Sequence, residues 1–292
     1  SENIGKAKRV DDAQGRYAEF CKNTFPKDLS LEGLKIVLDC SHGATYQVAP
    51  KIFTELGADI QTIGVGPNGT NINDGCGSTS LELLSTEVKK INADLGVAFD
   101  GDGDRVLMVN SNGDKVDGDQ LLFIIVRAAF EESYFDGGVV GTLMTNLAFE
   151  ENMKELGVGF SRSEVGDRHV SEMMQEKNWM YGGENSGHII LKDFHTTGDG
   201  VISALQVLKA IKKRHISFDQ AVSEINLYPQ ILLNIPLDKK IDLEADEIQS
   251  SIHEAEKLMN NNGRVLLRKS GTEPLIRIMT ESKDKHNALD AA

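Results

Sequence analysis

The stretch LGVAFDGDGDR, residues 95–105, joins an apolar run to an acidic turn. The apolar run is short and ends at turn residues, which predicts a buried strand. The chain then reaches Asp100, Asp102 and Asp104, which alternate with glycines. Because alternate residues of an extended or turning chain point the same way, we expect the three carboxylates to converge. Converging carboxylates repel one another unless some stay protonated or a cation lies between them.

A divalent cation removes this repulsion. Oxygen ligands without a neighbouring His or Cys indicate a hard ion, and we predict Mg²⁺ as the cofactor. An EF-hand calcium loop also begins with alternating acidic residues, but it requires Gly next and Glu at its twelfth position. Arg105 and Ser111 occupy those positions here, which excludes that class. A solvated acidic turn is the alternative that the spacing leaves open.

Short apolar runs alternate with helical patterns on both sides of this stretch. The run at 35–39 is followed by a helical pattern, and Thr79 with Glu82 predicts a capping box for another helix. A second block of the same kind starts near 114–118. Such alternation is typical of parallel sheets covered by helices. After Pro229 the pattern changes to a strand, a helix and two strands.

The fold class that follows is α/β. A chain of 292 residues is long enough for two or three domains. We expect two mixed or parallel α/β sandwich domains and a smaller C-terminal α+β domain. The expected bounds of the three domains are residues 1–115, 116–225 and 226–292.

The composition excludes several classes of protein. The formal net charge is −14, so nucleic acid and anionic membrane surfaces are poor partners, and an anionic ligand requires a local basic group. The apolar run at 121–126 is far shorter than the ~20 residues that cross a bilayer. Cys21, Cys40 and Cys76 form no CxxC pair, which fits a reducing cytoplasm better than a disulfide scaffold.

A basic loop follows a predicted strand near the C-terminus. The loop contains Arg268, Ser270, Gly271 and Thr272, and Arg277 comes shortly after it. Guanidinium groups, hydroxyls and the backbone N–H of a glycine are the donors that a phosphate dianion needs. The loop therefore predicts a phosphate site, with an ordinary turn carrying solvated charges as the alternative.

A polar loop, GENSGH, occupies residues 183–188 between two predicted strands. Glu184 and Ser186 are suited to binding sugar hydroxyls, because a carboxylate accepts hydrogen bonds and a hydroxyl both donates and accepts. His188 is a candidate for proton transfer near a reacting oxygen. Arg168, at a predicted helix start, is a further candidate for substrate binding. The alternatives are a polar turn with a satisfied His and an ordinary helix start.

In this order, the three loops resemble the metal, sugar-binding and phosphate-binding loops of the α-D-phosphohexomutase superfamily. Segments such as 40–45 and 116–120 are similar to the bacterial phosphoglucosamine mutases. The resemblance covers nearly the whole chain and implies a four-domain protein arranged around a cleft. The sequence matches the second, third and fourth domains. The family's first domain carries a phosphoserine loop that we do not find here, and we expect the fourth domain to be clipped.

The resemblance implies that the complete enzyme interconverts glucosamine 6-phosphate and glucosamine 1-phosphate through a phosphoserine and a bisphosphate intermediate. It implies a cytoplasmic enzyme of amino-sugar and peptidoglycan-precursor metabolism, with a homodimer as one expectation. Asp100, Asp102 and Asp104 would hold Mg²⁺, and Arg105 would neutralise charge beside them. By the same resemblance, Glu184 and Ser186 would hold the sugar, with His188 close to the reacting end. The phosphate that does not react would be held by Arg268, Ser270, Gly271, Thr272 and Arg277.

Three other functions are compatible with the same residues. The nearest is a phosphomannomutase or phosphoglucomutase of the same superfamily. A second is a chain that binds Mg²⁺ or a sugar phosphate without turning it over. A third is a haloacid-dehalogenase-like phosphatase, because Asp100 and Asp102 have the spacing of its nucleophile and its acid. In that class, however, the aspartates follow the first strand, whereas here they come later.

Overall fold

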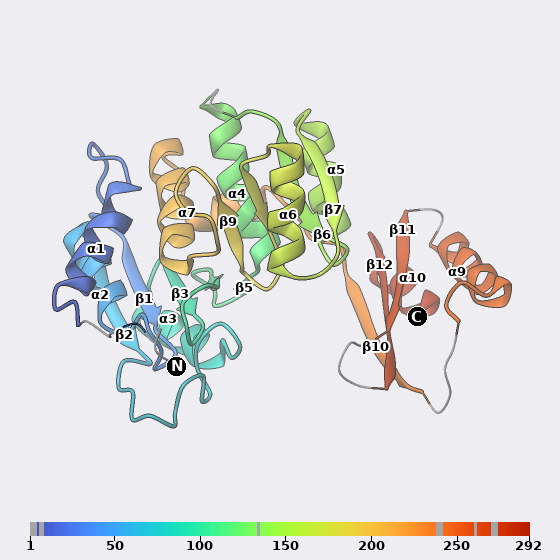
Figure 1. The fold of residues 1–292 in the computed structure, drawn as a ribbon, viewed down its shortest axis with the longest axis horizontal. Helices are drawn as coiled ribbons and strands as arrows, with labels where there is room; N and C mark the ends of the chain where they lie inside the picture. Colours follow the sequence, from blue (N-terminus) through green and yellow to red (C-terminus); the bar gives the residue numbers. More distant parts are fainter. Residues whose placement is uncertain (1–4, 6–8, 133–134, 238–241, 260–261, 270–273) are drawn as a thin grey trace.

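The computed structural model describes residues 5, 9–132, 135–237, 242–259, 262–269 and 274–292. Within these residues the strands form three sheets, which follow one another along the chain (Figure 1). We call the parts of the chain that carry them the first unit, the second unit and the C-terminal unit. The fold class expected from the sequence is confirmed: two α/β units precede a smaller α+β unit.

The first unit is a five-stranded sheet in the order β2-β1-β3-β4-β5. β1 runs parallel to both β2 and β3, whereas β4 and β5 are antiparallel, so the sheet is mixed. β1 and β3 are apolar along nearly their whole length because helices cover both faces of the sheet. The elements are α1 (Ala13–Asn23), β1 (Lys35–Asp39), α2 (Val48–Glu55), β2 (Asp59–Ile63), α3 (Glu82–Ile91), β3 (Leu95–Phe99), β4 (Val106–Val109) and β5 (Lys115–Val116).

The second unit is a four-stranded sheet in the order β7-β6-β8-β9. β6 is parallel to β7 and β8, and β9 is antiparallel to β8. The elements are α4 (Gly118–Glu131), β6 (Gly138–Thr142), α5 (Leu147–Glu155), β7 (Gly159–Ser163), α6 (Asp167–Lys177), β8 (Tyr181–Gly183), β9 (Ile189–Leu191), α7 (Gly200–Arg214) and α8 (Phe218–Ser223).

The C-terminal unit is an antiparallel sheet in the order β10-β12-β11 with two helices. The helices cover one face of this sheet (Figure 1). The elements are β10 (Gln230–Pro236), α9 (Asp246–Leu258), β11 (Gly263–Lys269), β12 (Leu275–Ser282) and α10 (Lys285–Ala291).

The first two units share one hydrophobic core. Phe53 and Phe99 of the first unit and Phe123 and Phe149 of the second are fully buried in the same cluster. The helices α4 and α7 pack against each other at the centre of this cluster. Among the described residues, no side chain beyond residue 227 belongs to it. The C-terminal unit therefore attaches to the rest by other means.

One local prediction from the sequence is wrong. The helix α3 begins at Glu82 with Leu81 as its N-cap, and no side chain caps it. The hydroxyl of Ser80 instead donates to the Glu82 carboxylate at 2.9 Å, so Thr79 and Glu82 form no capping box. A capping box is present at α4, where the side chain of Asp117 accepts from the Gln120 N–H and the side chain of Gln120 accepts from the Asp117 N–H.

Candidate functional site

The acidic loop follows β3 and is closed by its own first carboxylate. Oδ1 of Asp100 accepts hydrogen bonds from the backbone N–H groups of Gly103 and Arg105, both at 3.1 Å. This curvature brings Asp100, Asp102 and Asp104 together, so that each offers an oxygen within 4.8 Å of the others. The convergence expected from the sequence is confirmed.

The electrostatics of this loop fit a cation. Burial raises the pKa of Asp100 to about 7, and its hydrogen bond with Asp104 and the negative charges of Asp104 and Asp102 act in the same direction. Oδ1 of Asp104 is buried and has no hydrogen-bond partner among the described residues. A divalent ion bound here would coordinate the unpartnered oxygen of Asp104 and would stabilise the ionised form of Asp100.

Arg105 lies at the edge of the acidic loop. Its Nε is 3.9 Å from Oδ2 of Asp100 and 3.8 Å from Oδ1 of Asp104, distances too long for hydrogen bonds. The side chain is 46% exposed. Its guanidinium group is therefore close to the carboxylates and still accessible to an anionic ligand.

The loop at 183–188 connects β8 to β9 and lies directly against the acidic loop. The backbones of Arg105 and His188 pair as an isolated antiparallel bridge. The N–H of Val106 donates to the carbonyl of Gly187 at 3.1 Å. Two loops from different units are thus joined by backbone hydrogen bonds, and the structure brings the predicted metal and sugar residues to one place.

His188 is 2% exposed, and both of its ring nitrogens are engaged. Nε2 accepts a hydrogen bond from the Gly198 backbone N–H at 3.1 Å, and Nδ1 lies 3.1 Å from Oδ2 of Asp104. Because the amide can only donate, Nε2 carries no proton, and Nδ1–H donates to the carboxylate. The ring therefore lies behind the acidic loop and orients Asp104, while its predicted role near the sugar stays a prediction.

A turn that the sequence analysis missed completes this arrangement. Residues 198–200, Gly-Asp-Gly, lead into α7, which begins at Gly200, and the N–H of Gly200 donates to the Gly103 carbonyl at 2.8 Å. Asp199 caps α7 by accepting from the Ile202 N–H, and it also accepts from the Tyr17 hydroxyl. A Cβ atom on Gly198 would lie 2.6 Å from the His188 ring. An N-cap aspartate between two glycines is a signal that could have pointed to this turn.

The other predicted sugar residues surround the same loop. Oε1 of Glu184 accepts from the Gly166 N–H at 3.0 Å, which joins the loop to the start of α6. Oγ of Ser186 is buried without a hydrogen-bond partner in the described part of the chain. Arg168, in the first turn of α6, is exposed and pairs with Glu172 at 2.8 Å. Glu184 therefore joins the loop to the start of α6, and Arg168 lies exposed in the first turn of that helix.

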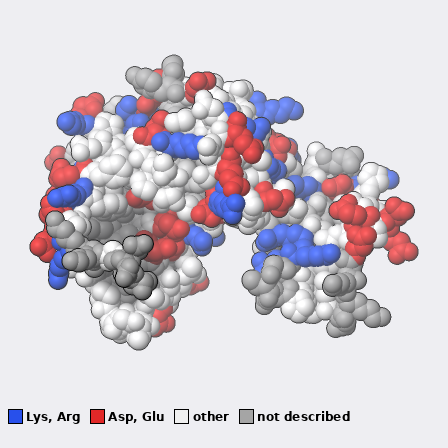
Figure 2. Space-filling model, viewed as in Figure 1, with Lys and Arg blue, Asp and Glu red and all other residues white. Residues whose placement is uncertain are grey.

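The predicted phosphate residues lie on the C-terminal unit. Arg268 on β11 and Arg277 on β12 are directly opposite each other in the register. Both line a cavity of about 310 Å³, which Met144 of the second unit also borders. Guanidinium groups on facing strands supply the kind of donors that phosphate oxygens accept from. Ser270, Gly271 and Thr272 lie outside the described residues. Figure 2 shows basic atoms gathered on the side of this unit nearest the rest of the molecule.

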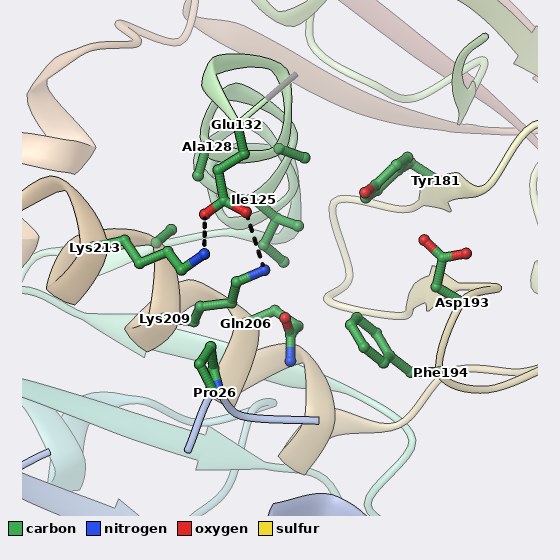
Figure 3. Close-up of a pocket in the computed structure, with 12 residues that line it drawn as sticks. Pro26, Ile125, Ala128, Glu132, Tyr181, Asp193, Phe194, Gln206, Lys209 and Lys213 are labelled. Atoms are coloured by element: carbon green, nitrogen blue, oxygen red, sulfur yellow. Dashed lines mark ion pairs between the residues drawn. The ribbon is translucent and has the colours of Figure 1, made fainter. Parts of the chain in front are cut away.

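A second cavity, of about 440 Å³, lies between α4 and α7 (Figure 3). Tyr181, which begins β8, lines it, whereas the loop at 183–188 follows the other end of that strand. Glu132 projects into this cavity and pairs with Lys213 at 2.9 Å and with Lys209 at 3.6 Å. The two lysines share this single carboxylate, so one positive charge of the three side chains is not compensated by the glutamate.

Three family models match consecutive parts of the chain. They are phosphoglucomutase/phosphomannomutase α/β/α domain II at residues 15–113, α/β/α domain III at 117–228 and the C-terminal domain at 232–291. The chain therefore belongs to the phosphoglucomutase/phosphomannomutase family, and the resemblance seen in the sequence is confirmed.

Within this family, the chain is similar to phosphoglucosamine mutases. It is 53% identical to that of Edwardsiella ictaluri (strain 93-146) and 54% identical to that of Aeromonas hydrophila, over 100% of this chain and 66% of each relative. It is 52% identical to that of Pasteurella multocida, over 97% of this chain and 64% of the relative. The chain thus spans slightly less than two thirds of the length of these relatives.

Solved structures share the fold at low sequence identity. A phosphoglucomutase/phosphomannomutase family protein from Burkholderia thailandensis has a TM-score of 0.78 and 18% identity, over 97% of this chain and 63% of that one. An Aspergillus fumigatus N-acetylphosphoglucosamine mutase, in complex with GlcNAc-6P and magnesium, has a TM-score of 0.75 and 17% identity, over 95% and 68%. In the described part of the chain, no helix is long and apolar enough to cross a membrane.

Proposed function

We propose that the protein to which this chain belongs interconverts glucosamine 6-phosphate and glucosamine 1-phosphate. The observation that carries the proposal is the backbone pairing of Arg105 with His188, which places three converging carboxylates beside the predicted sugar loop. Relatives about half identical over the whole chain are phosphoglucosamine mutases, which supports this substrate over mannose or glucose phosphates.

The acidic loop would hold Mg²⁺ through Asp100, Asp102 and Asp104. When bound, the ion would neutralise charge on a transferring phosphoryl group. The orphaned oxygen of Asp104 and the raised pKa of Asp100 support this assignment. A distant structural neighbour is described as a complex with magnesium. Arg105, half exposed beside the carboxylates, would bind the anionic group from the other side.

The sugar and its second phosphate would be held by side chains of different units. Glu184 would accept hydrogen bonds from sugar hydroxyls and Ser186 would accept or donate them, with Arg168 of α6 as a further substrate ligand. The buried, unpartnered hydroxyl of Ser186 among the described residues supports this role. The phosphate that does not react would be bound by residues of the C-terminal unit: Arg268, Ser270, Gly271, Thr272 and Arg277.

A phosphoserine that is not part of the printed sequence would donate the phosphoryl group. This group would pass to one oxygen of the sugar phosphate, giving a bisphosphate that then returns its other phosphoryl group to the serine. An Aspergillus fumigatus structural neighbour is described in complex with glucose 1,6-bisphosphate, which supports such an intermediate in the fold.

We also propose a cytoplasmic setting, because all three cysteines are buried and unpaired. We further propose a homodimer, which light scattering can test.

The test is a ³¹P NMR titration of this chain with glucosamine 6-phosphate, glucose 6-phosphate and mannose 6-phosphate in the presence of Mg²⁺. We expect glucosamine 6-phosphate to bind best and none of the three to be converted, because the phosphoserine is supplied from elsewhere. Tighter binding of mannose or glucose 6-phosphate would favour a phosphomannomutase or phosphoglucomutase. Release of inorganic phosphate would favour the phosphatase alternative.

A further inference from the structure

The C-terminal sheet carries three rows of side chains across one face. Alternate residues of a strand share a face, and the register aligns them across β10, β12 and β11. The rows are Gln230, Glu281 and Arg264, the docking row; Leu232, Met279 and Leu266; and Asn234, Arg277 and Arg268, the cation row. The docking row and the cation row lie on the same face about 13 Å apart, at the usual rise per residue.

The docking row is attached to the segment 143–147 of the second unit, which connects β6 to α5. Arg264 donates to the carbonyls of Leu143 and Thr145 at 2.9 and 2.7 Å. Glu281 is fully buried and accepts from the Leu147 backbone N–H at 2.9 Å. Nε of Arg264 also donates to Glu281 at 2.5 Å. The guanidinium group of Arg264 therefore donates both to the segment 143–147 and to Glu281 on the neighbouring strand β12.

The same segment is held from inside the second unit. Its Asn146 N–H donates to Asp119 of α4 at 2.7 Å, and Arg162 of β7 donates to the Thr145 carbonyl at 2.6 Å. The Asn146 side chain exchanges two hydrogen bonds with the backbone of Tyr228, where the chain passes toward β10. The segment is thus held by side chains of the second unit, and the docking row binds to a part of the chain that the second unit positions.

Arg264 and Glu281 supply hydrogen bonds across this junction, and no side chain of the C-terminal unit in the described residues joins the shared core. A buried ion pair contributes little net attraction, since the loss of hydration offsets most of it. A planar guanidinium group nevertheless accepts few orientations when it donates to several fixed acceptors. Such a junction therefore determines how the two units are oriented more than how tightly they are held together.

We propose that Arg264 and Glu281 are positioning residues that fix the angle between the C-terminal unit and the second unit. Because the cation row shares their face and strands, this angle aims the cation row at a phosphate whose sugar is bound by the loop at 183–188. The proposal rests on the function proposed above and adds two residues that do not touch the substrate.

Two ligands separate this role from direct support of the phosphate site. Inorganic phosphate needs only the cation row, whereas glucosamine 6-phosphate needs the cation row and the sugar loop in register. The variant Arg264→Lys keeps a positive charge beside Glu281 but cannot reach both carbonyls. By calorimetry, we expect its dissociation constant for glucosamine 6-phosphate to rise at least about tenfold, and that for inorganic phosphate to change less than about twofold.

A matched control is available at the same junction. Lys283 pairs with Glu151 of α5 at 3.0 Å, but its side chain is 52% exposed. Exposed ion pairs contribute little, so Lys283→Ala should leave both dissociation constants unchanged.

The angle itself can be measured between spin labels at Glu176→Cys on α6 and Glu254→Cys on α9, because the native cysteines are buried. We expect a broader distance distribution in Arg264→Lys than in the unaltered chain or in Lys283→Ala.

Two results would overturn the proposal: an unchanged distance distribution in Arg264→Lys, or equal weakening of both ligands. Equal weakening would mean that Arg264 supports the cation row directly. Failure of the proposed function has a different signature, because the unaltered chain would then bind glucosamine 6-phosphate no better than inorganic phosphate. The distance distributions would still decide whether Arg264 fixes the angle.

Discussion

At the scale of single residues, the ring of His188 connects parts of the chain that are 84 positions apart. Its Nδ1–H orients Asp104, and its Nε2 receives the Gly198 N–H. Removing a group that orients a metal ligand typically weakens metal binding on the order of 10- to 100-fold. The two hydrogen bonds of the ring can be removed one at a time.

Asn and Gln at position 188 separate the two hydrogen bonds. The amide nitrogen of His188→Asn would lie close to the place of Nδ1 and could still donate to Asp104. The longer His188→Gln would reach the place of Nε2 and lose that donor. By calorimetry, we expect Mg²⁺ to bind about tenfold more weakly to His188→Gln, and nearly normally to His188→Asn. Equal Mg²⁺ affinity in both variants would show that His188 does not act through Asp104.

The spacing of the aspartates was sufficient to predict their convergence, because alternate residues in a tight turn can only point to one side. The direction of the His188 ring could not be predicted in the same way. It depends on Asp104, which belongs to the other unit and reaches the ring only after the two sheets have packed together. Sequence spacing describes neighbours along the chain, and this contact is between units.

At the scale of elements, the N-terminus of α7 determines how closely the two units approach. Gly198 and Gly200 leave room for the acidic loop, since a Cβ on Gly200 would lie 2.6 Å from the Arg105 carbonyl. Asp199 fixes the start of the helix as its N-cap. Sequence patterns predicted α7 as a helix, but its packing against the acidic loop is a tertiary contact that no helical periodicity contains.

The substitution Gly198→Ala tests this approach. Its Cβ would lie 2.6 Å from the His188 ring and 2.7 Å from the Asp104 carbonyl, so the turn must shift. We expect a loss of about 1–3 kcal/mol in the free energy of unfolding, together with weaker Mg²⁺ binding. Urea unfolding and calorimetry would measure the two effects.

Gly15→Ala in α1 is the matched control, because nothing lies within 4 Å of its added Cβ. It should stabilise the chain by about 0.5–1 kcal/mol through helix propensity alone. If Gly198→Ala proved as harmless as Gly15→Ala, the close approach of α7 to the acidic loop would be refuted.

The capping box shows where element-level prediction fails. Thr79 and Glu82 have the right spacing, but the helix starts later, at Glu82 itself. Asp117 and Gln120 have the same spacing and do form the box. The difference lies in the preceding chain, because Asp117 is extended and can turn its carboxylate back to the helix, whereas Leu81 is already in a helical conformation.

At the scale of the whole molecule, the junction between the second and C-terminal units contains buried charge that should make stability depend on pH. Asp119 is 2% exposed and accepts the Asn146 N–H. Burial raises its pKa well above the usual value, the charge of Asp117 adds to this, and the hydrogen bond from Asn146 opposes it. The sequence predicted a domain change after Pro229, but it could not predict that charged residues on α4, β7, β11 and β12 meet there.

The sign of the pH dependence follows from this raised pKa. Above about pH 4, the usual pKa of Asp, the unfolded chain gives up the proton while the folded chain still holds it. The folded chain therefore binds more protons, and the stability that Asp119 contributes is lost as the pH rises above this value.

The variant Asp119→Asn cannot titrate, and its side chain still accepts the Asn146 N–H. We expect the free energy of unfolding of the unaltered chain to fall relative to this variant as the pH rises above the usual pKa of Asp, which is about 4. Urea unfolding of both chains at several pH values would measure this difference. Parallel curves would mean that Asp119 is ionised in the folded chain, and that Arg162 and the Asn146 N–H outweigh its burial.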